Sequence, residues 1–240
     1  MSAVQWIFCS GMPRSASTWS YNVARLLTMK RQNSVWANFA DTPETLDKQL
    51  GEAEKQHETV AVFKFHKASE RVMQLLQAGI AVNVFTYRHP LAAIASWREI
   101  FGLPLDIAVR VTTDALRDMD RYQRLPGTLF VAMRDVVQSG YAATERVASH
   151  LGYSSLSPEH IAEVACTTST DQMAKMAESL RVSKARLIDV GFTRYDPVTH
   201  LHVGHINRGL DRNYRQDLTE DEIAICRAAL QPWFPAYESW

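Results

Sequence analysis

The chain has 240 residues, which is enough to bury an apolar core without disulfides or a metal. Its 26 lysines and arginines balance 26 aspartates and glutamates, so the net charge is zero with neutral histidines. This balance argues against partners that are bound through a strong overall charge, and we expect neither nucleic acid nor a membrane surface as a partner. No linker or internal repeat interrupts the sequence, so we expect a single domain over residues 1–240.

Cysteine usage and hydropathy indicate the compartment. Cys9, Cys166 and Cys226 are odd in number and scattered, which argues against a disulfide framework and for a reducing environment. The first residues lack the pattern of a signal peptide, and no apolar run reaches the roughly 18 residues of a membrane helix. The sequence therefore predicts a cytoplasmic protein.

Strand and helix patterns alternate along the chain. β-Branched and apolar runs predict strands at residues 4–9, 59–65, 80–87 and 128–133. Apolar residues at helical spacing predict helices at residues 18–29, 42–57, 72–79, 90–101, 106–121, 140–151, 158–165, 170–180 and 219–230. Such alternation favours an α/β fold with three αβα layers and a central parallel sheet. Residues 181–215 are irregular, and we expect a long functional loop there.

The first predicted strand runs into a loop of small residues, Ser10 to Trp19. Such a junction leaves backbone N–H groups unpaired at the start of the next helix, with the positive end of the helix dipole behind them. Arg14 adds a permanent cation, and neighbouring hydroxyls add donors. The junction predicts a phosphate-binding loop of the P-loop nucleotide-binding type. Ala16 and Ser17 stand where an NTPase has Gly and Lys, so the lysine that reaches the outer phosphates of ATP is missing.

The segment from Pro13 to Trp19 resembles the 5′-phosphosulfate loop of sulfotransferases that use 3′-phosphoadenosine 5′-phosphosulfate (PAPS). That family has Pro-[Lys/Arg]-Ser-Gly-[Ser/Thr]-Thr-Trp, and Ala16 is the single departure. The resemblance implies PAPS as the sulfuryl donor, no metal, and stacking of the aromatic residue on the base. The nucleotide-binding residues that it implies here are Arg14, Ser15, Ala16, Ser17, Thr18 and Trp19.

A second motif follows the third predicted strand. Arg88 leaves the strand end, and Ser96 follows it by eight positions, roughly 9 Å up a helix that starts at Pro90. Alone, the pair is more often structural, with Arg88 in a surface ion pair and Ser96 a small residue packed under a neighbouring helix. Together with the first loop, it resembles the 3′-phosphate motif of the same family, in which a guanidinium and a hydroxyl meet across one phosphate.

Lys64 and His66 lie two residues apart at the end of the second predicted strand, so they point to the same face. Alone, a histidine at a strand end is more often structural. The pair resembles the Lys-x-His of cytosolic sulfotransferases, which implies His66 as general base and Lys64, with Arg14, as a group that holds the transferring sulfuryl. Histidine suits this role because its ordinary pKa is near neutrality.

Two weaker similarities complete the set. Residues 206–215 resemble the segment that closes over the nucleotide, and they imply contacts from Asn207, Arg208 and Gly209. Residues 167–173 resemble a stretch along the adenine, which implies a contact from Thr168.

The residues expected along the adenine depart from the family, because Met133 replaces a tyrosine and Thr170 an aromatic residue. The closing segment departs from it as well, because Asn207 replaces an arginine and Arg212 a glycine. His200, His202 and His205 cluster, but their spacing matches no usual zinc site, so we expect no metal.

The sequence predicts a sulfotransferase that moves the sulfuryl group of PAPS to a hydroxyl or amine of a small-molecule or carbohydrate acceptor. A P-loop small-molecule kinase and a nucleotide-binding module without catalysis remain alternatives. Three expected lid segments, 31–41, 102–106 and 181–201, favour an apolar or aromatic acceptor and leave a sugar open. Aromatic residues in or beside these segments are Trp36, Phe39, Phe101, Phe192 and Tyr195.

Overall fold

The computed structural model describes residues 5–29, 34–55, 60–182, 187–189, 194–203, 213–233 and 237. Within this part of the chain, no helix is long and apolar enough to cross a membrane.

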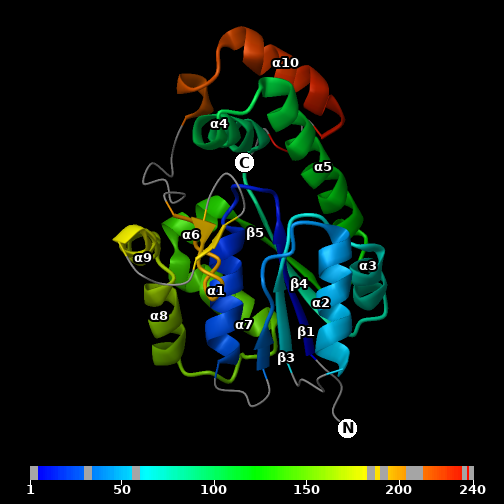
Figure 1. The fold of residues 1–240 in the computed structure, drawn as a ribbon, viewed down its shortest axis with the longest axis vertical. Coiled ribbons are helices and arrows are strands. Elements are labelled where there is room, and N and C mark those ends of the chain that lie inside the picture. Colours follow the sequence, from blue (N-terminus) through cyan, green and yellow to red (C-terminus); the bar gives the residue numbers. More distant parts are fainter. Residues whose placement is uncertain are drawn as a thin grey trace.

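The centre of the fold is a five-stranded parallel sheet in the order β2-β3-β1-β4-β5 (Figure 1). Its central strand is apolar on both faces, as parallel strands covered by helices are. Ile7 and Phe8, on opposite faces of that strand, are both fully buried. The strands are β1 (Gln5–Gly11), β2 (Ser34–Trp36), β3 (Val60–Lys64), β4 (Ala81–Tyr87) and β5 (Thr128–Ala132). The expected α/β fold with a parallel sheet is confirmed.

Helices cover both faces of the sheet (Figure 1). Their bounds are α1 (Ser17–Thr28), α2 (Pro43–Lys55), α3 (Glu70–Gln77), α4 (Pro90–Phe101), α5 (Leu105–Gln123), α6 (Met133–Gln138), α7 (Gly140–His150), α8 (Pro158–Thr167), α9 (Thr170–Val182) and α10 (Glu220–Leu230). One core joins α1, α7 and α8 to the sheet, and a second joins α2 and α3 to its other face. A third core joins α4, α5 and α10 beyond the carboxyl ends of the strands.

Two short elements were absent from the sequence prediction. β2 has three half-buried residues at the sheet edge, which is too short to show an alternating pattern. α6 starts at Met133, where we expected the fourth strand to continue, and it has no buried residue. A helix without a buried face gives no apolar periodicity, and this explains the wrong assignment.

The expected loop over residues 181–215 contains some regular structure in its described part. β6 (Ile188–Asp189) and β7 (Arg194–Tyr195) form an antiparallel pair, and Tyr214–Gln216 form a short 3₁₀ helix. A second 3₁₀ helix, Gln231–Trp233, follows α10.

The strand order places a crevice at the carboxyl end of β1. The chain forms β3 on one side of β1 and then crosses to form β4 on the other side. Ligands of parallel α/β sheets bind beyond the carboxyl ends of strands at such a reversal. The ends of β1, β3 and β4 are therefore where the topology places a site.

Candidate functional site

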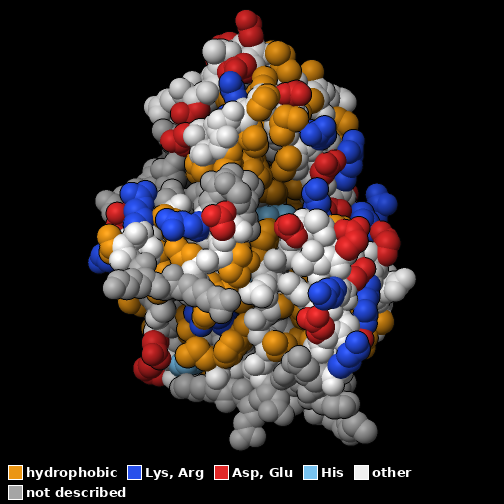
Figure 2. Space-filling model, viewed as in Figure 1, with side chains coloured by type: hydrophobic (Ala, Val, Ile, Leu, Met, Phe, Trp, Pro, Cys, Tyr) orange, Lys and Arg blue, Asp and Glu red, His pale blue; other side chains and the backbone are white. Residues whose placement is uncertain are grey.

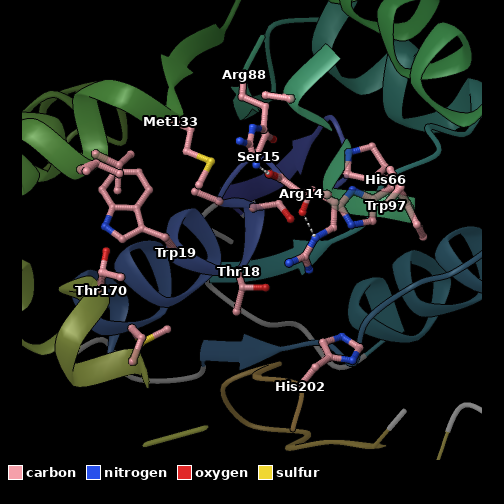
Figure 3. Close-up of a pocket in the computed structure, with 18 of the residues that line it drawn as sticks. Arg14, Ser15, Thr18, Trp19, His66, Arg88, Trp97, Met133, Thr170 and His202 are labelled. Carbon is pink, nitrogen blue, oxygen red and sulfur yellow. Dashed lines mark hydrogen bonds between the residues drawn. The ribbon is translucent and has the colours of Figure 1, made fainter. Parts of the chain in front are cut away.

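A cavity of about 250 Å³ lies at the carboxyl ends of β1, β3 and β4 (Figure 3). It is lined by every described residue that the sequence assigned to the site. These are Arg14, Ser15, Ala16, Ser17, Thr18, Trp19, Lys64, His66, Arg88, Ser96 and Thr168. Asn207, Arg208 and Gly209 lie outside the described residues.

The loop between β1 and α1 turns through two residues with positive φ. Arg14 has φ 69° and Ala16 has φ 75°, which is the left-handed region that glycine enters without steric cost. Ala16 is the position at which the similar sulfotransferase loop has glycine, so the backbone keeps the glycine conformation with an alanine. Non-glycine residues in this region cost roughly 1–3 kcal/mol and cluster at ligand-binding sites.

Ser15 and Gly11 hold this loop against β4. The fully buried Ser15 hydroxyl contacts the Met12 carbonyl and lies 2.7 Å from the carbonyl oxygen of Thr86. A Cβ on Gly11 would lie 2.6 Å from the same Thr86 oxygen, so only glycine allows this close approach. We expected the Ser15 hydroxyl to face a phosphate, but the structure uses it inside the fold. The loop is therefore held by the main chain of the sheet.

Arg14 links the two expected phosphate positions. Its Nε donates to Ser96 Oγ at 3.2 Å, and Arg88 Nη1 donates to the carbonyl oxygen of Arg14 at 3.3 Å (Figure 3). Burial lowers the pKa of each arginine to about 10, so both remain protonated at neutral pH. Two permanent positive charges thus lie in one partly dehydrated cavity.

Lys64 adds a third cationic group. Its side chain is 2 % exposed, and Nζ lies 4.3 Å from the centre of the Phe39 ring. Burial lowers the pKa of Lys64 to about 7, with a smaller contribution from Arg14 in the same direction. Among the described residues, neither Lys64 nor Arg88 forms an ion pair with a carboxylate. Buried cations in this situation favour an anionic ligand.

His66 is oriented by the end of β1. Its Nδ1 lies 2.8 Å from the carbonyl oxygen of Gly11, and because a carbonyl only accepts, Nδ1 carries the proton of the neutral ring. The lone pair of Nε2 is therefore available to accept a proton. Burial, followed by the charge of Lys64, lowers the pKa of His66 to about 3. The ring is neutral at physiological pH.

The cavity has two sides. Trp19, Met133 and Thr170 lie on one side, and His66 and Trp97 lie on the other, with Arg14 nearer to His66 (Figure 3). The first group comes from α1, α6 and α9, whereas Trp97 comes from α4. The two sides of the cavity are thus formed by different helices.

Several lining residues were missed by sequence reasoning. Glu99 lies three residues after Ser96 on α4, so helical spacing from the phosphate motif contains a signal for it. His202 lines the cavity on the segment after β7, whereas we had considered it only as a metal ligand. Other such residues are Val136, Val137, Met173, Leu201 and Asp217. Because helix α6 was not predicted, the sequence analysis did not place Val136 and Val137 at the cavity.

The expected lid residues divide between cavity and core. Phe39 and Phe101 line the cavity. Trp36 instead donates its indole N–H to Thr28 Oγ1 at 3.1 Å, and Tyr195 is buried beside His200 outside the cavity lining. Phe192 lies outside the described residues.

His200 is a core residue. Its ring is fully buried and stacks on Tyr21, with centroids 4.0 Å apart. Within the described ranges, no three His, Cys, Asp or Glu side chains form a metal-binding group.

The sequence has no match among protein-family models and no significant match among curated proteins. Solved structures do match its fold. Mouse sulfotransferase SULT7A1 in complex with PAP aligns with 99 % of this chain and 85 % of its own, at TM-score 0.68 and 10 % identity.

Two further structures have the same fold. Retinol dehydratase, in a complex with retinol and PAP, aligns with 97 % of this chain and 81 % of its own at TM-score 0.61 and 14 % identity. The sulfotransferase domain of the Synechococcus PCC 7002 olefin synthase aligns with 95 % of this chain and 94 % of its own at TM-score 0.53 and 17 % identity. The resemblance carried by the motifs is thus confirmed at the level of fold: the chain has the α/β fold of PAP-binding sulfotransferases.

Proposed function

We propose that this protein is a PAPS-dependent sulfotransferase that acts on a hydroxyl of a small-molecule acceptor. One observation carries the proposal: the residues to which the motifs assign roles come from separate parts of the chain and line a single cavity. The loop after β1, the end of β3, the end of β4, α4 and the end of α8 each contribute. Core packing alone does not require three cationic side chains to share one cavity.

The cavity residues fit a ligand with two phosphate groups. The N–H groups at the start of α1 and the guanidinium of Arg14 would hold the 5′-phosphosulfate. Arg88 and Ser96 would hold the 3′-phosphate, and Trp19 would stack on the adenine. When bound, PAPS supplies an activated sulfuryl group joined to a phosphate that is a good leaving group.

Transfer needs a base, a positioned sulfuryl group and stabilisation of the leaving oxygen. His66 Nε2 would take the proton of the acceptor hydroxyl while that oxygen forms its bond to sulfur. The bond from sulfur to the bridging phosphate oxygen breaks, and its electron pair leaves with 3′-phosphoadenosine 5′-phosphate. Arg14, Lys64 and the loop amides would stabilise negative charge on the sulfuryl and phosphate oxygens.

The side of the cavity that holds His66 indicates the acceptor class. Its walls include Phe39, Trp97 and Phe101, whose aromatic rings favour an apolar or aromatic alcohol over a carbohydrate. Trp97 and Phe101 pack together, with ring centroids 4.7 Å apart. We propose a small apolar or aromatic alcohol as the acceptor.

Calorimetry with 3′-phosphoadenosine 5′-phosphate, AMP and magnesium ATP tests the nucleotide site. We expect strong preference for the 3′-phosphorylated ligand, because AMP leaves the half-buried Arg88 guanidinium without its phosphate. Equal affinities for that ligand and AMP would overturn the sulfotransferase proposal and favour the kinase.

Transfer of labelled sulfuryl from PAPS to a panel of phenols, aliphatic alcohols, amines and sugars tests the chemistry. We expect label in a phenol or an aliphatic alcohol. Tight nucleotide binding with no transfer to any acceptor would instead indicate a binding module without catalysis. Label in a sugar alone would overturn the proposed acceptor class.

A further inference from the structure

The main chain on both sides of Phe39 is hydrogen-bonded to β3 near the end of that strand. Ala37 N donates to Val62 O at 3.0 Å, and Ala40 N donates to Lys64 O at 3.0 Å. Ala40 also forms an isolated parallel bridge with Phe65. The chain after β2 therefore stays hydrogen-bonded along β3, and Phe39 lies between two of these attachments.

The ring of Phe39 contacts both groups to which we assign the transfer. The Nζ of Lys64 lies 4.3 Å from the ring centre. The His66 ring has its centroid 5.6 Å away with an interplanar angle of 66°, which is an edge-to-face contact. Phe39 is half-buried and lines the cavity. One aromatic side chain thus borders the amine, the imidazole and the space for ligands.

We propose that Phe39 is a positioning residue for sulfuryl transfer, which holds the Lys64 amine and the His66 imidazole in place and excludes water from both. This inference rests on the proposed function. Phe39 itself gives or takes no proton. It acts through the two groups that do the chemistry.

The ring has two opposing effects on Lys64. Its π face attracts the ammonium form, and its bulk keeps water away and so favours the neutral amine. The groups around the pair are Cys9 on β1, Arg14 on the loop after β1, and His200 after β7. Burial raises the pKa of Cys9 to about 12 and lowers that of His200 well below its ordinary range, while Arg14 stays protonated. Lys64 is therefore the group of this set that titrates near neutral pH.

Two substitutions separate the two effects. Phe39→Leu retains apolar bulk but removes the π face, so the pKa of Lys64 should fall. Phe39→Ala admits water, so the pKa of Lys64 should rise toward its ordinary value, and that of His66 should rise with it. Phe39→Tyr retains the ring and should restore the behaviour of the original protein. A residue that merely supports the fold would not shift the titration in opposite directions.

The direct measurement is an NMR titration of ¹³Cε-labelled lysine in the full-length protein, with Lys64→Arg to assign the signal. We expect the midpoint to move by about half a pH unit or more, downward in Phe39→Leu and upward in Phe39→Ala. Phe101→Leu is the matched control, because Phe101 lines the same cavity from α4. Its Lys64 midpoint should stay unchanged. One common Lys64 midpoint in the original protein and both Phe39 variants would overturn the inference.

The pH profile of turnover connects this titration to the reaction. The alkaline limb of the kcat/KM profile, which reports groups of the free protein, should follow the Lys64 midpoint, downward for Phe39→Leu and upward for Phe39→Ala. We expect kcat to fall about tenfold in each variant. If the original protein transfers sulfuryl but the Phe39 variants have the same pH profile as the original protein, only this inference is overturned. An original protein that neither binds 3′-phosphoadenosine 5′-phosphate nor transfers sulfuryl overturns the proposed function, and the role of Phe39 in transfer with it.

Discussion

The two sides of the cavity are built differently. The proposed nucleotide side, defined by Arg14, Ser15, Arg88 and Ser96, is fixed by hydrogen bonds that reach the main chain of β4 and the loop after β1. The acceptor side, defined by Phe39, Trp97, Phe101 and His202, comes from the segment after β2, from α4 and from the segment after β7. Its walls are side chains rather than main chain.

This difference separates what each side can recognise. Main-chain N–H groups and buried guanidinium groups in fixed positions suit one ligand chemistry, which is phosphate. Aromatic side chains on separate elements set the shape of a pocket, and a single substitution alters that shape. Substitutions on one side should therefore change the binding of one ligand and leave the other nearly unchanged.

The largest expected effect is on the nucleotide side. Arg88→Ala should reduce the preference for 3′-phosphoadenosine 5′-phosphate over AMP by roughly 2–4 kcal/mol, about 30- to 700-fold, because it removes one side of a charged hydrogen-bonded pair. Calorimetry with both nucleotides measures it. Arg110→Ala, an exposed arginine on α5, is the matched control and should retain the preference. An unchanged preference in Arg88→Ala would remove this residue from the 3′-phosphate site.

His66 tests whether the transfer step can be impaired without impairing nucleotide binding. His66→Ala should lower turnover by a factor on the order of 10² and leave nucleotide affinity nearly intact, because it removes the base and not the phosphate loop. Single-turnover kinetics with PAPS measure the transfer rate, and separate nucleotide titrations measure the affinity. His160→Ala on α8 is the control, since His160 does not line the cavity. Turnover close to that of the original protein would assign the base elsewhere.

Loss of an aromatic side chain from the acceptor side should weaken acceptor binding. Phe101→Ala should raise the acceptor KM about tenfold with little change in nucleotide affinity, because burial of an aromatic wall contributes roughly 1.5–3 kcal/mol and solvent replaces part of it. Steady-state kinetics with the best acceptor measures this effect. Tyr141→Ala, an exposed aromatic residue on α7, should change neither value. A nucleotide affinity that falls with the acceptor affinity would contradict the separation of the two sides.

The smallest expected effect is a pH dependence of nucleotide binding through Lys64. Its pKa is lowered to about 7 in the empty cavity, and a bound anion should raise it, so binding takes up a proton above pH 7. Affinity should therefore fall as pH rises above 7, by roughly three- to fivefold from pH 7 to 8. The second pKa of a phosphate monoester is about 6, so the 3′-phosphate changes its charge little between pH 7 and 8. Lys64→Arg should abolish the slope, and a slope that persists in that variant would assign it to another group.

Most of the nucleotide side could be predicted from the sequence because each part of it is local. Arg14 follows a strand and precedes a helix, and Ser96 lies two turns into a helix that starts at Pro90. Each motif lies at the end of one strand or in the loop or helix that follows it. That local structure is enough to place its residues at the carboxyl edge of the sheet. That edge brought Arg14, Arg88 and Ser96 into one cavity.

The acceptor side could be predicted only in part, because its residues carry no local pattern. Phe39 follows a three-residue strand, and His202 follows a two-residue strand, and neither element is long enough to show periodicity. The same holds on the opposite side of the cavity for α6, which carries Met133 and Val136. This helix has no buried residue, so its place at the cavity had no signal in the sequence.

The sequence by itself determined the alternation of strands and helices, the loop between β1 and α1, and the placement of Lys64 and His66 at one strand end, because these depend on local conformation and on spacing along one element. The tertiary structure decided what those groups contact. It turned the Ser15 hydroxyl toward Thr86, bonded Arg14 to Ser96, and placed the Phe39 ring against both Lys64 and His66. These contacts join residues far apart in the chain, and only the packing of the sheet and its crossovers brings such residues together.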